Sequence, residues 1–85
     1  MKAKEVFIIW RSEFVNGKLD FRMIWYICTS MKKAQIYLKN KVEINPEKTR
    51  FEENENNPEL NRVFETTNEF SQGFICYSID RQYMY

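Results

Sequence analysis

The segment Phe21-Arg-Met-Ile-Trp-Tyr-Ile-Cys-Thr-Ser-Met-Lys-Lys-Ala-Gln-Ile-Tyr-Leu-Lys-Asn-Lys-Val42 carries the signals that decide the fold. Its first eight residues are rich in aromatic and β-branched side chains, which is typical of a strand. Thr29 and Ser30 follow, and their hydroxyls can accept hydrogen bonds from the free N–H groups of a helix N-terminus. Apolar residues then recur with helical spacing. The segment therefore predicts a strand, an N-cap and an amphipathic helix over residues 30–42. Ile36 falls outside the apolar stripe of this helix, and we expect the later part of the chain to cover it. The stripe comprises Met31, Ala34, Tyr37, Leu38 and Val42.

A β-hairpin is predicted over residues 5–28. The Asn16-Gly17 dipeptide is the strongest short-range hairpin signal, because both central residues of a type I′ turn need a positive φ. A two-residue loop makes Val15 face Lys18 and fixes the pairs that follow. In that register the even-numbered residues of the first strand lie on the core face, against the helix.

The second half of the chain is predicted to add a polar loop, a short helix and a strand. Residues 43–57 are the polar loop, and residues 58–66 follow the helix-start signal Asn57-Pro58-Glu59 with an apolar stripe. Residues 74–83 alternate as a last strand, placed on the free edge of the first. We expect one α+β domain over residues 1–85, ββα(α)β, with a three-stranded antiparallel sheet of order 2-1-3 and both helices on one face.

The predicted register places Arg11 directly opposite Arg22 on the face away from the helix. Two like charges side by side are unfavourable unless something compensates them. One interpretation is that Glu13 and Asp20 bridge them diagonally. The other is that the two guanidiniums form a fork for phosphate or for a partner's carboxylate.

Other candidate binding residues surround this pair. Tyr26 and Phe7 offer stacking surface for a base or a flat side chain. Lys32 and Lys33 put positive charge in the first turn of the helix, where it opposes the helix dipole and could face phosphate, although a solvated charged face explains them too. The candidate partner-binding or nucleic-acid-binding residues are thus Arg11, Arg22, Tyr26, Phe7, Lys32 and Lys33.

Charge is unevenly distributed along the chain. Residues 1–42 contain nine Lys or Arg and three Asp or Glu, a net charge of +6, whereas residues 43–70 contain three and eight, a net charge of −5. This asymmetry indicates a basic face that could meet phosphate or an acidic protein, or two halves that neutralise one another.

The composition argues against several functional classes. No histidine is present, and only two glycines occur, so no Gly-rich phosphate loop, nucleophile elbow or paired-cysteine metal site is found. We therefore expect no enzyme, cofactor or metal. Cys28 and Cys76 are expected to be buried, reduced thiols. No segment is apolar enough to span a membrane, and the N-terminus does not resemble a signal peptide, so a cytoplasmic location is expected.

The segment Ile24-Trp-Tyr-Ile-Cys-Thr-Ser-Met-Lys-Lys-Ala34 resembles the strand–Thr/Ser–helix step of small uncharacterised ββαβ proteins of bacteria and phages. Small size, AT-rich coding and lack of catalytic groups are also similar to phage-encoded inhibitors of host defence or host enzymes. This resemblance implies a function by direct binding to a host protein, such as a defence toxin or nuclease, and assigns no functional residue.

Three functions that need no catalysis are therefore consistent with the sequence. The first is a protein-interaction module that inhibits or adapts a host protein. The second is a protein that binds RNA or single-stranded nucleic acid through sheet aromatics and basic residues. The third is a homodimer whose exposed sheet face pairs with itself.

Overall fold

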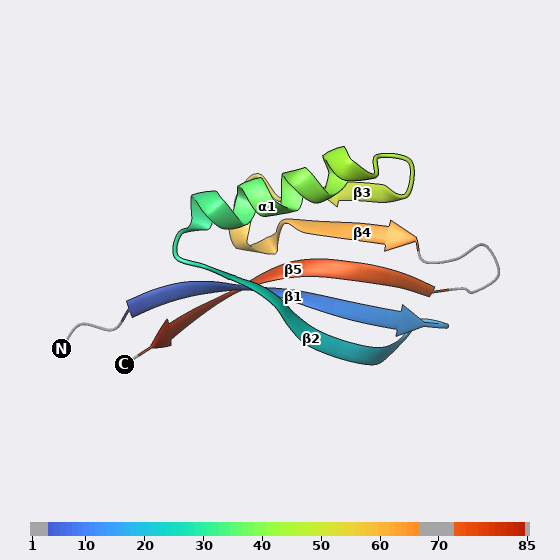
Figure 1. The fold of residues 1–85 in the computed structure, drawn as a ribbon, viewed down its shortest axis with the longest axis horizontal. Helices are drawn as coiled ribbons and strands as arrows, with labels where there is room; N and C mark the ends of the chain where they lie inside the picture. Colours follow the sequence, from blue (N-terminus) through green and yellow to red (C-terminus); the bar gives the residue numbers. More distant parts are fainter. Residues whose placement is uncertain (1–3, 67–72, 85) are drawn as a thin grey trace.

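A computed structural model describes residues 4–66 and 73–84 of the chain, as one helix lying against a strongly twisted sheet (Figure 1). The elements follow one another as β1 (Lys4–Val15), β2 (Lys18–Cys28), α1 (Met31–Ile44), β3 (Thr49–Glu52), the single 3₁₀ turn η1 (Pro58–Leu60), β4 (Arg62–Thr66) and β5 (Gly73–Met84).

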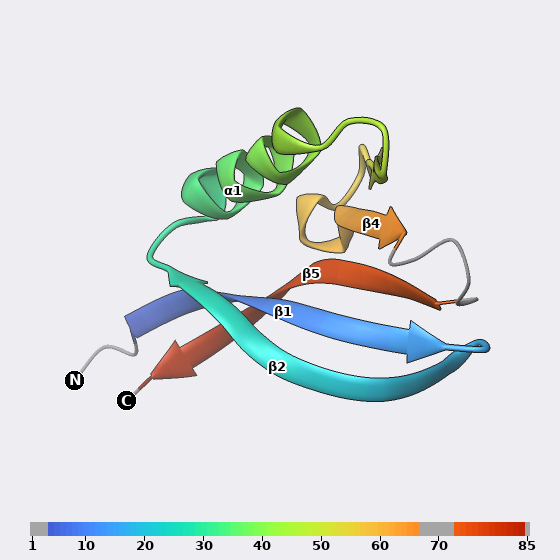
Figure 2. The ribbon, with the colours of Figure 1, turned by 45° about the vertical axis from the view of Figure 1, so that its right-hand side comes forward.

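The sheet has five antiparallel strands in the order β2-β1-β5-β4-β3. The α+β class is therefore confirmed, and the last strand does lie antiparallel beside β1. The predicted three-stranded sheet with a second helix is wrong, because two more strands continue the sheet beyond β5. α1 lies on one face of this sheet (Figure 2). At 14 residues it is too short, and too polar, to cross a membrane, and no other described helix could do so.

The segment predicted as a second helix over residues 58–66 is mostly strand. Asn57 does cap the one turn that forms, because its side chain accepts a hydrogen bond from the Glu59 N–H. A helix of nine residues gains little from propensity alone. As a strand, the same segment pairs with β5 and places Val63 opposite Tyr77 in the core. Sheet pairing therefore outweighs the helical spacing of Leu60, Val63 and Phe64.

The predicted polar loop over residues 43–57 is also wrong in part. α1 continues to Ile44, and the Asn45 carbonyl then accepts hydrogen bonds from the N–H groups of Lys48 and Thr49 in a turn. Residues 49–52 follow as β3, with Phe51 opposite Val63. A single alternating Thr-Arg-Phe-Glu stretch suffices for a short edge strand, because β4 supplies its hydrogen bonds.

The hairpin turn is confirmed, but its register is not. Asn16 and Gly17 have φ values of 53° and 79°, as a type I′ turn requires. Val15 faces Lys18, but Asp20 and Trp25 have no partner on β1, and the pairing shifts by one residue at each of them. Such bulges turn the following side chains to the other face of the strand. Independently of these bulges, odd-numbered residues of β1, such as Phe7 and Ile9, face the helix and the core, contrary to the prediction.

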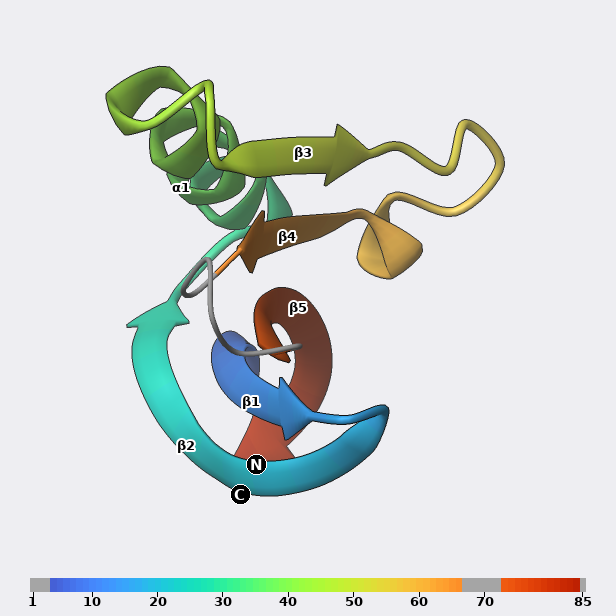
Figure 3. The ribbon, with the colours of Figure 1, turned by 90° about the vertical axis from the view of Figure 1, so that its right-hand side faces the viewer.

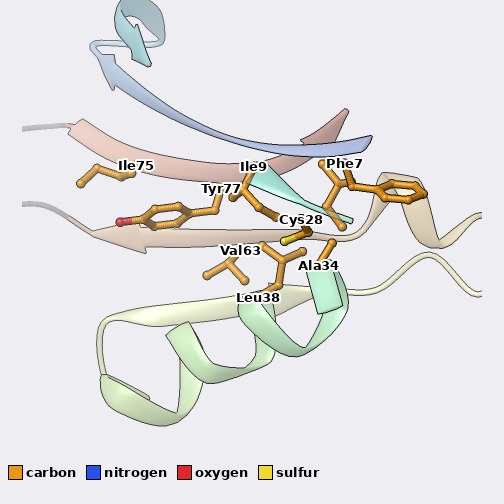
Figure 4. Packing of buried hydrophobic residues seen from close by; sticks show 9 residues of the cluster. Phe7, Ile9, Cys28, Ala34, Leu38, Val63, Ile75 and Tyr77 are labelled. Carbon is orange, nitrogen blue, oxygen red and sulfur yellow. The ribbon is translucent and has the colours of Figure 1, made fainter. Parts of the chain in front are cut away.

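The core lies between α1 and the sheet and draws on four strands (Figure 4). Its buried members are Phe7, Ile9, Cys28, Ala34, Leu38, Val63, Ile75, Tyr77 and Ile79. The predicted apolar stripe of the helix is confirmed, because Ala34 and Leu38 are buried and its other members pack against the cluster. The predicted N-cap is confirmed too: the Ser30 hydroxyl accepts a hydrogen bond from the Lys33 N–H at 3.2 Å.

Candidate functional site

β2 is the unusual element of this fold. It forms one edge of the sheet and, among the described strands, pairs only with β1. It bends round the outside of β1 until its C-terminal end meets α1 (Figure 3). Every residue from 18 to 27 is exposed. Seven large apolar or aromatic side chains are 37–54% exposed, namely Leu19, Phe21, Met23, Ile24, Trp25, Tyr26 and Ile27. In natural proteins, a long, apolar and exposed edge strand usually marks a surface that binds another chain.

A groove of about 470 Å³ lies where the end of β2 meets α1. We call it the β2–α1 groove; its lining residues are Tyr26, Ile27, Cys28, Thr29, Lys33, Ile36, Tyr37 and Asn40. One wall is aromatic, because the rings of Tyr26 and Tyr37 stack at 5.1 Å with an interplanar angle of 6°. The groove therefore joins strand and helix in one partly apolar surface.

Lys33 supplies the charge of the groove. Its ammonium group contacts the Thr29 hydroxyl at 3.5 Å, and no carboxylate pairs with it among residues 4–66 and 73–84. Lys32 precedes it on the exposed side of α1. Since a weak contact to one neutral hydroxyl leaves most of its hydrogen-bonding capacity open, Lys33 can bind a carboxylate or phosphate oxygen of a ligand.

Ile36 lies in the groove and is 48% exposed. It falls outside the buried stripe of α1, and we expected the later part of the chain to cover it. That expectation is wrong, because β3 and β4 extend the sheet beyond β5, on the side away from β2. An isoleucine outside the core stripe of a helix was thus the sequence signal for this wall of the groove.

The thiol of Cys28 is buried beneath the groove. Burial raises the pKa of this thiol, although the nearby Lys33 lowers it in part. Burial likewise raises the pKa of Cys76 on β5, with a smaller opposing effect from Arg62. Both cysteines are free, so they are neutral thiols at pH 7, poorly suited to act as nucleophiles or metal ligands.

The two arginines predicted to lie side by side are on opposite faces of the sheet. Arg11 is opposite Met23, on the helix side, and donates to Glu13 at 2.6 Å. Partial burial would lower the pKa of Arg11, but hydrogen bonds to Tyr77 and Glu13 raise it overall. Arg22 is opposite Ser12 on the other face. The predicted fork is therefore wrong.

Arg22 instead lies beside a second hollow of about 380 Å³. Its guanidinium covers the ring of Trp10, 4.1 Å from the ring centre. Arg62 shares the hollow with two carboxylates, Glu59 and Asp80, so its charges are mixed and do not make a site selective for anions.

Of the remaining predicted residues, Tyr26 and Lys33 line the groove and Lys32 adjoins it. Phe7 is buried opposite Cys28 and cannot reach a ligand. Nowhere in the described part of the chain do three or more His, Cys, Asp or Glu side chains come together as a metal site would need.

A lysine fixes the groove end of β2 to the helix. The ammonium group of Lys41 lies 5.0 Å from the Trp25 ring centre, 4.8 Å from that of Tyr77 and 5.8 Å from that of Tyr37. Burial, the largest cause, raises the pKa of Tyr37, so its phenol stays neutral. These cation–π contacts tie α1, β2 and β5 together and hold Tyr37 beside Tyr26.

Comparison with known proteins adds no relative to this picture: no protein-family model, no curated protein and no solved structure matches the chain. The resemblance to small phage-encoded proteins therefore stays an expectation.

Proposed function

We propose that this protein acts by binding another protein, as a cytoplasmic inhibitor or adaptor of a host protein, and that the β2–α1 groove receives a segment of that partner. One observation carries the proposal: exposed apolar and aromatic side chains stand beside Lys33, whose charge has no carboxylate partner among the described residues. Such a surface offers both burial and an oriented charge, the usual elements of a specific protein contact.

The groove favours a partner segment of defined chemistry. An apolar or aromatic side chain would pack against Ile36 and the Tyr26–Tyr37 pair, and a nearby carboxylate would accept hydrogen bonds from Lys33. Lys32, next on the helix, would add attraction to an acidic segment. The free thiols of Cys28 and Cys76 fit the reducing environment of the cytoplasm.

Nucleic-acid binding has less support. Few aromatic faces are open to bases, because Phe7 is buried, Arg22 covers one face of Trp10, and one face of Tyr26 stacks on Tyr37. The open rings do not form the row of stacking platforms on which successive bases of a single strand bind.

The test is affinity capture from bacterial lysate with matched variants. The tagged native chain, Ile36→Glu, Lys33→Glu and the control Ile44→Glu are compared, each with and without nuclease treatment. Ile36 and Ile44 are exposed isoleucines on the same helix, and Ile44, at 80% exposure, lies outside the groove. We expect one protein to be retained by the native chain and the control in both lysates, and lost by both groove variants.

Two results would contradict the proposal. Equal retention of that protein by Ile36→Glu would place its binding surface outside the groove. Loss of all partners after nuclease treatment would indicate that nucleic acid carries the function.

A further inference from the structure

We infer that the outer edge of β2 joins two copies of this chain, whose β2 strands pair antiparallel across a two-fold axis. This inference concerns the part of β2 that precedes the groove, residues 18–25. It goes beyond the proposed binding of another protein. Phe21 and Met23 lie on the side of β2 that faces the helix layer, but neither lines the β2–α1 groove.

The backbone of β2 has one edge available for pairing. Only β1 pairs with it, and the described residues offer no other hydrogen-bond partner to its outer N–H and C=O groups. That edge faces away from the rest of the sheet (Figure 3). An edge strand that meets its own copy antiparallel forms an isologous contact, in which each copy offers the same surface.

The part of β2 before the groove supplies apolar surface for such a contact. Its exposed apolar side chains within residues 18–24 are Leu19, Phe21, Met23 and Ile24. A large side chain carries roughly 150–250 Å² of surface, so four of them at about half exposure present on the order of 400 Å² per copy. This is about half of the roughly 800 Å² per partner that stable interfaces bury, and the paired backbone and charged side chains of the two strands contribute the remainder. Tyr26 and Ile27 stay outside this contact, in the β2–α1 groove.

The other sheet edge explains why assembly stops at two copies. β3 has only four residues, and its Arg50 and Glu52 side chains are exposed and lie 3.8 Å apart as an ion pair. Short length and charge are the features that prevent edge strands from pairing. With one edge open and one protected, the contact closes as a dimer and does not extend into a fibre.

The charges on β2 favour one register. A two-fold axis at Arg22 would set like charges against each other, which is unfavourable. An axis at Phe21 places Asp20 of each copy beside Arg22 of the other, so two ion pairs form symmetrically. The regular stretch of β2 between its bulges, residues 21–24, contains this axis.

The first test is the molecular mass in solution, measured by light scattering over a range of concentrations. We expect the native chain to have twice the 10.4 kDa of one chain. Phe21→Lys and Met23→Lys should weaken association at least tenfold and shift the mass to one chain, because each buries a charge in the contact. The control Leu60→Lys changes an exposed leucine on η1 and should leave the dimer intact.

A cysteine scan tests the same contact without adding charge. Because Cys28 and Cys76 are buried, a single introduced cysteine is the reactive thiol of the chain. Residues that face each other across antiparallel strands have Cα atoms about 4.5–5.5 Å apart, within disulfide range. Phe21→Cys should therefore form a cross-linked dimer under mild oxidation, whereas Leu60→Cys should not. Cross-linking at Met23→Cys would place the axis there and equally support β2 pairing.

Three results would overturn the inference. The first is a native chain of 10.4 kDa at every concentration tested. The second is a dimer that persists in Phe21→Lys with a native circular dichroism spectrum. The third is equal cross-linking by Phe21→Cys and Leu60→Cys. Capture of a host protein by the groove is measured separately, so it can succeed or fail independently of dimerisation.

Discussion

The guanidinium carbon of Arg22 lies 4.1 Å from the centre of the Trp10 ring, on the face of the sheet opposite to Arg11. Two arginines that a regular hairpin would pair are thus separated by the sheet itself. The bulge at Asp20 is the cause, because one extra residue in β2 moves Arg22 from Arg11 to Ser12. Each arginine then has its own partners: Trp10 for Arg22, and Glu13 and the Trp25 ring for Arg11.

This separation predicts that the two arginines contribute independently to stability. Arg11→Ala and Arg22→Ala should each lower the free energy of unfolding by about 0.5–2 kcal/mol, the range for cation–π and ion-pair contacts from exposed sites to partly buried ones. The double variant should equal the sum within about 0.5 kcal/mol, as for sites without shared partners. Urea denaturation of all four chains measures this. A double variant clearly more stable than the sum would instead indicate that the two charges repel each other.

Local signals in the sequence predicted the first half of the fold, and its register required more. Asn16-Gly17 specifies the turn and Ser30 the helix start, because each acts through its immediate neighbours. The bulges at Asp20 and Trp25 have no such local signal. Trp25 owes its position to contacts with Lys41 and Tyr77, which are distant in sequence. Tertiary packing therefore decided which face of β1 became the core.

The same limit applies to the candidate site. Lys33 and Tyr26 were predicted from charge and aromatic character, but their meeting in one groove depends on the approach of β2 to α1. Ile36 was expected to be covered by the later part of the chain, but residues 62–66 form a strand on the far side of β5 and leave it exposed. Strand pairing between β4 and β5 was the missing information, and spacing along the chain does not contain it.

Lys41 should stabilise the fold through its charge. In Lys41→Met a side chain of similar length keeps the helix propensity and the apolar stem but loses the cation over Trp25, Tyr37 and Tyr77. We expect a loss of about 0.5–2 kcal/mol in unfolding free energy, measured by urea denaturation. Lys39→Met is the matched control, because Lys39 is exposed on the same helix and its ammonium group lies over no aromatic ring within residues 4–66 and 73–84. Equal stability of the two variants would show that the cation contributes nothing there.

Asn61 should be among the polar residues least tolerant of substitution. It is only 6% exposed, accepts a hydrogen bond from the Asn54 N–H at 2.6 Å and donates one to the Gln35 side chain at 2.8 Å. Asn61→Ala removes both, leaving partly buried groups without partners, so we expect a loss of about 1–3 kcal/mol. Asn56→Ala, in the exposed part of the same loop, should change stability by less than about 0.5 kcal/mol. Thermal or urea unfolding distinguishes the two, and a tolerated Asn61→Ala would contradict this role.

Stability should decrease at alkaline pH because of the buried thiols. Burial raises the pKa of Cys28 and Cys76 in the folded chain, so both keep their protons at pH values where the unfolded chain, with an ordinary thiol pKa of about 8.5, has lost them. The unfolded state then binds fewer protons than the native state, and the free energy of unfolding falls as pH rises above about 8.5. Below that pH the contribution of the thiols is fully present. The variant with Cys28→Ala and Cys76→Ala should be less stable at pH 7, because it loses buried sulfur atoms. Its stability should nevertheless fall less steeply between about pH 8 and 9, where an unfolded tyrosine of pKa about 10 is still mostly protonated and Tyr37 contributes little. Urea denaturation of both chains across this range measures the difference, and parallel slopes would show that the thiols do not cause the alkaline loss.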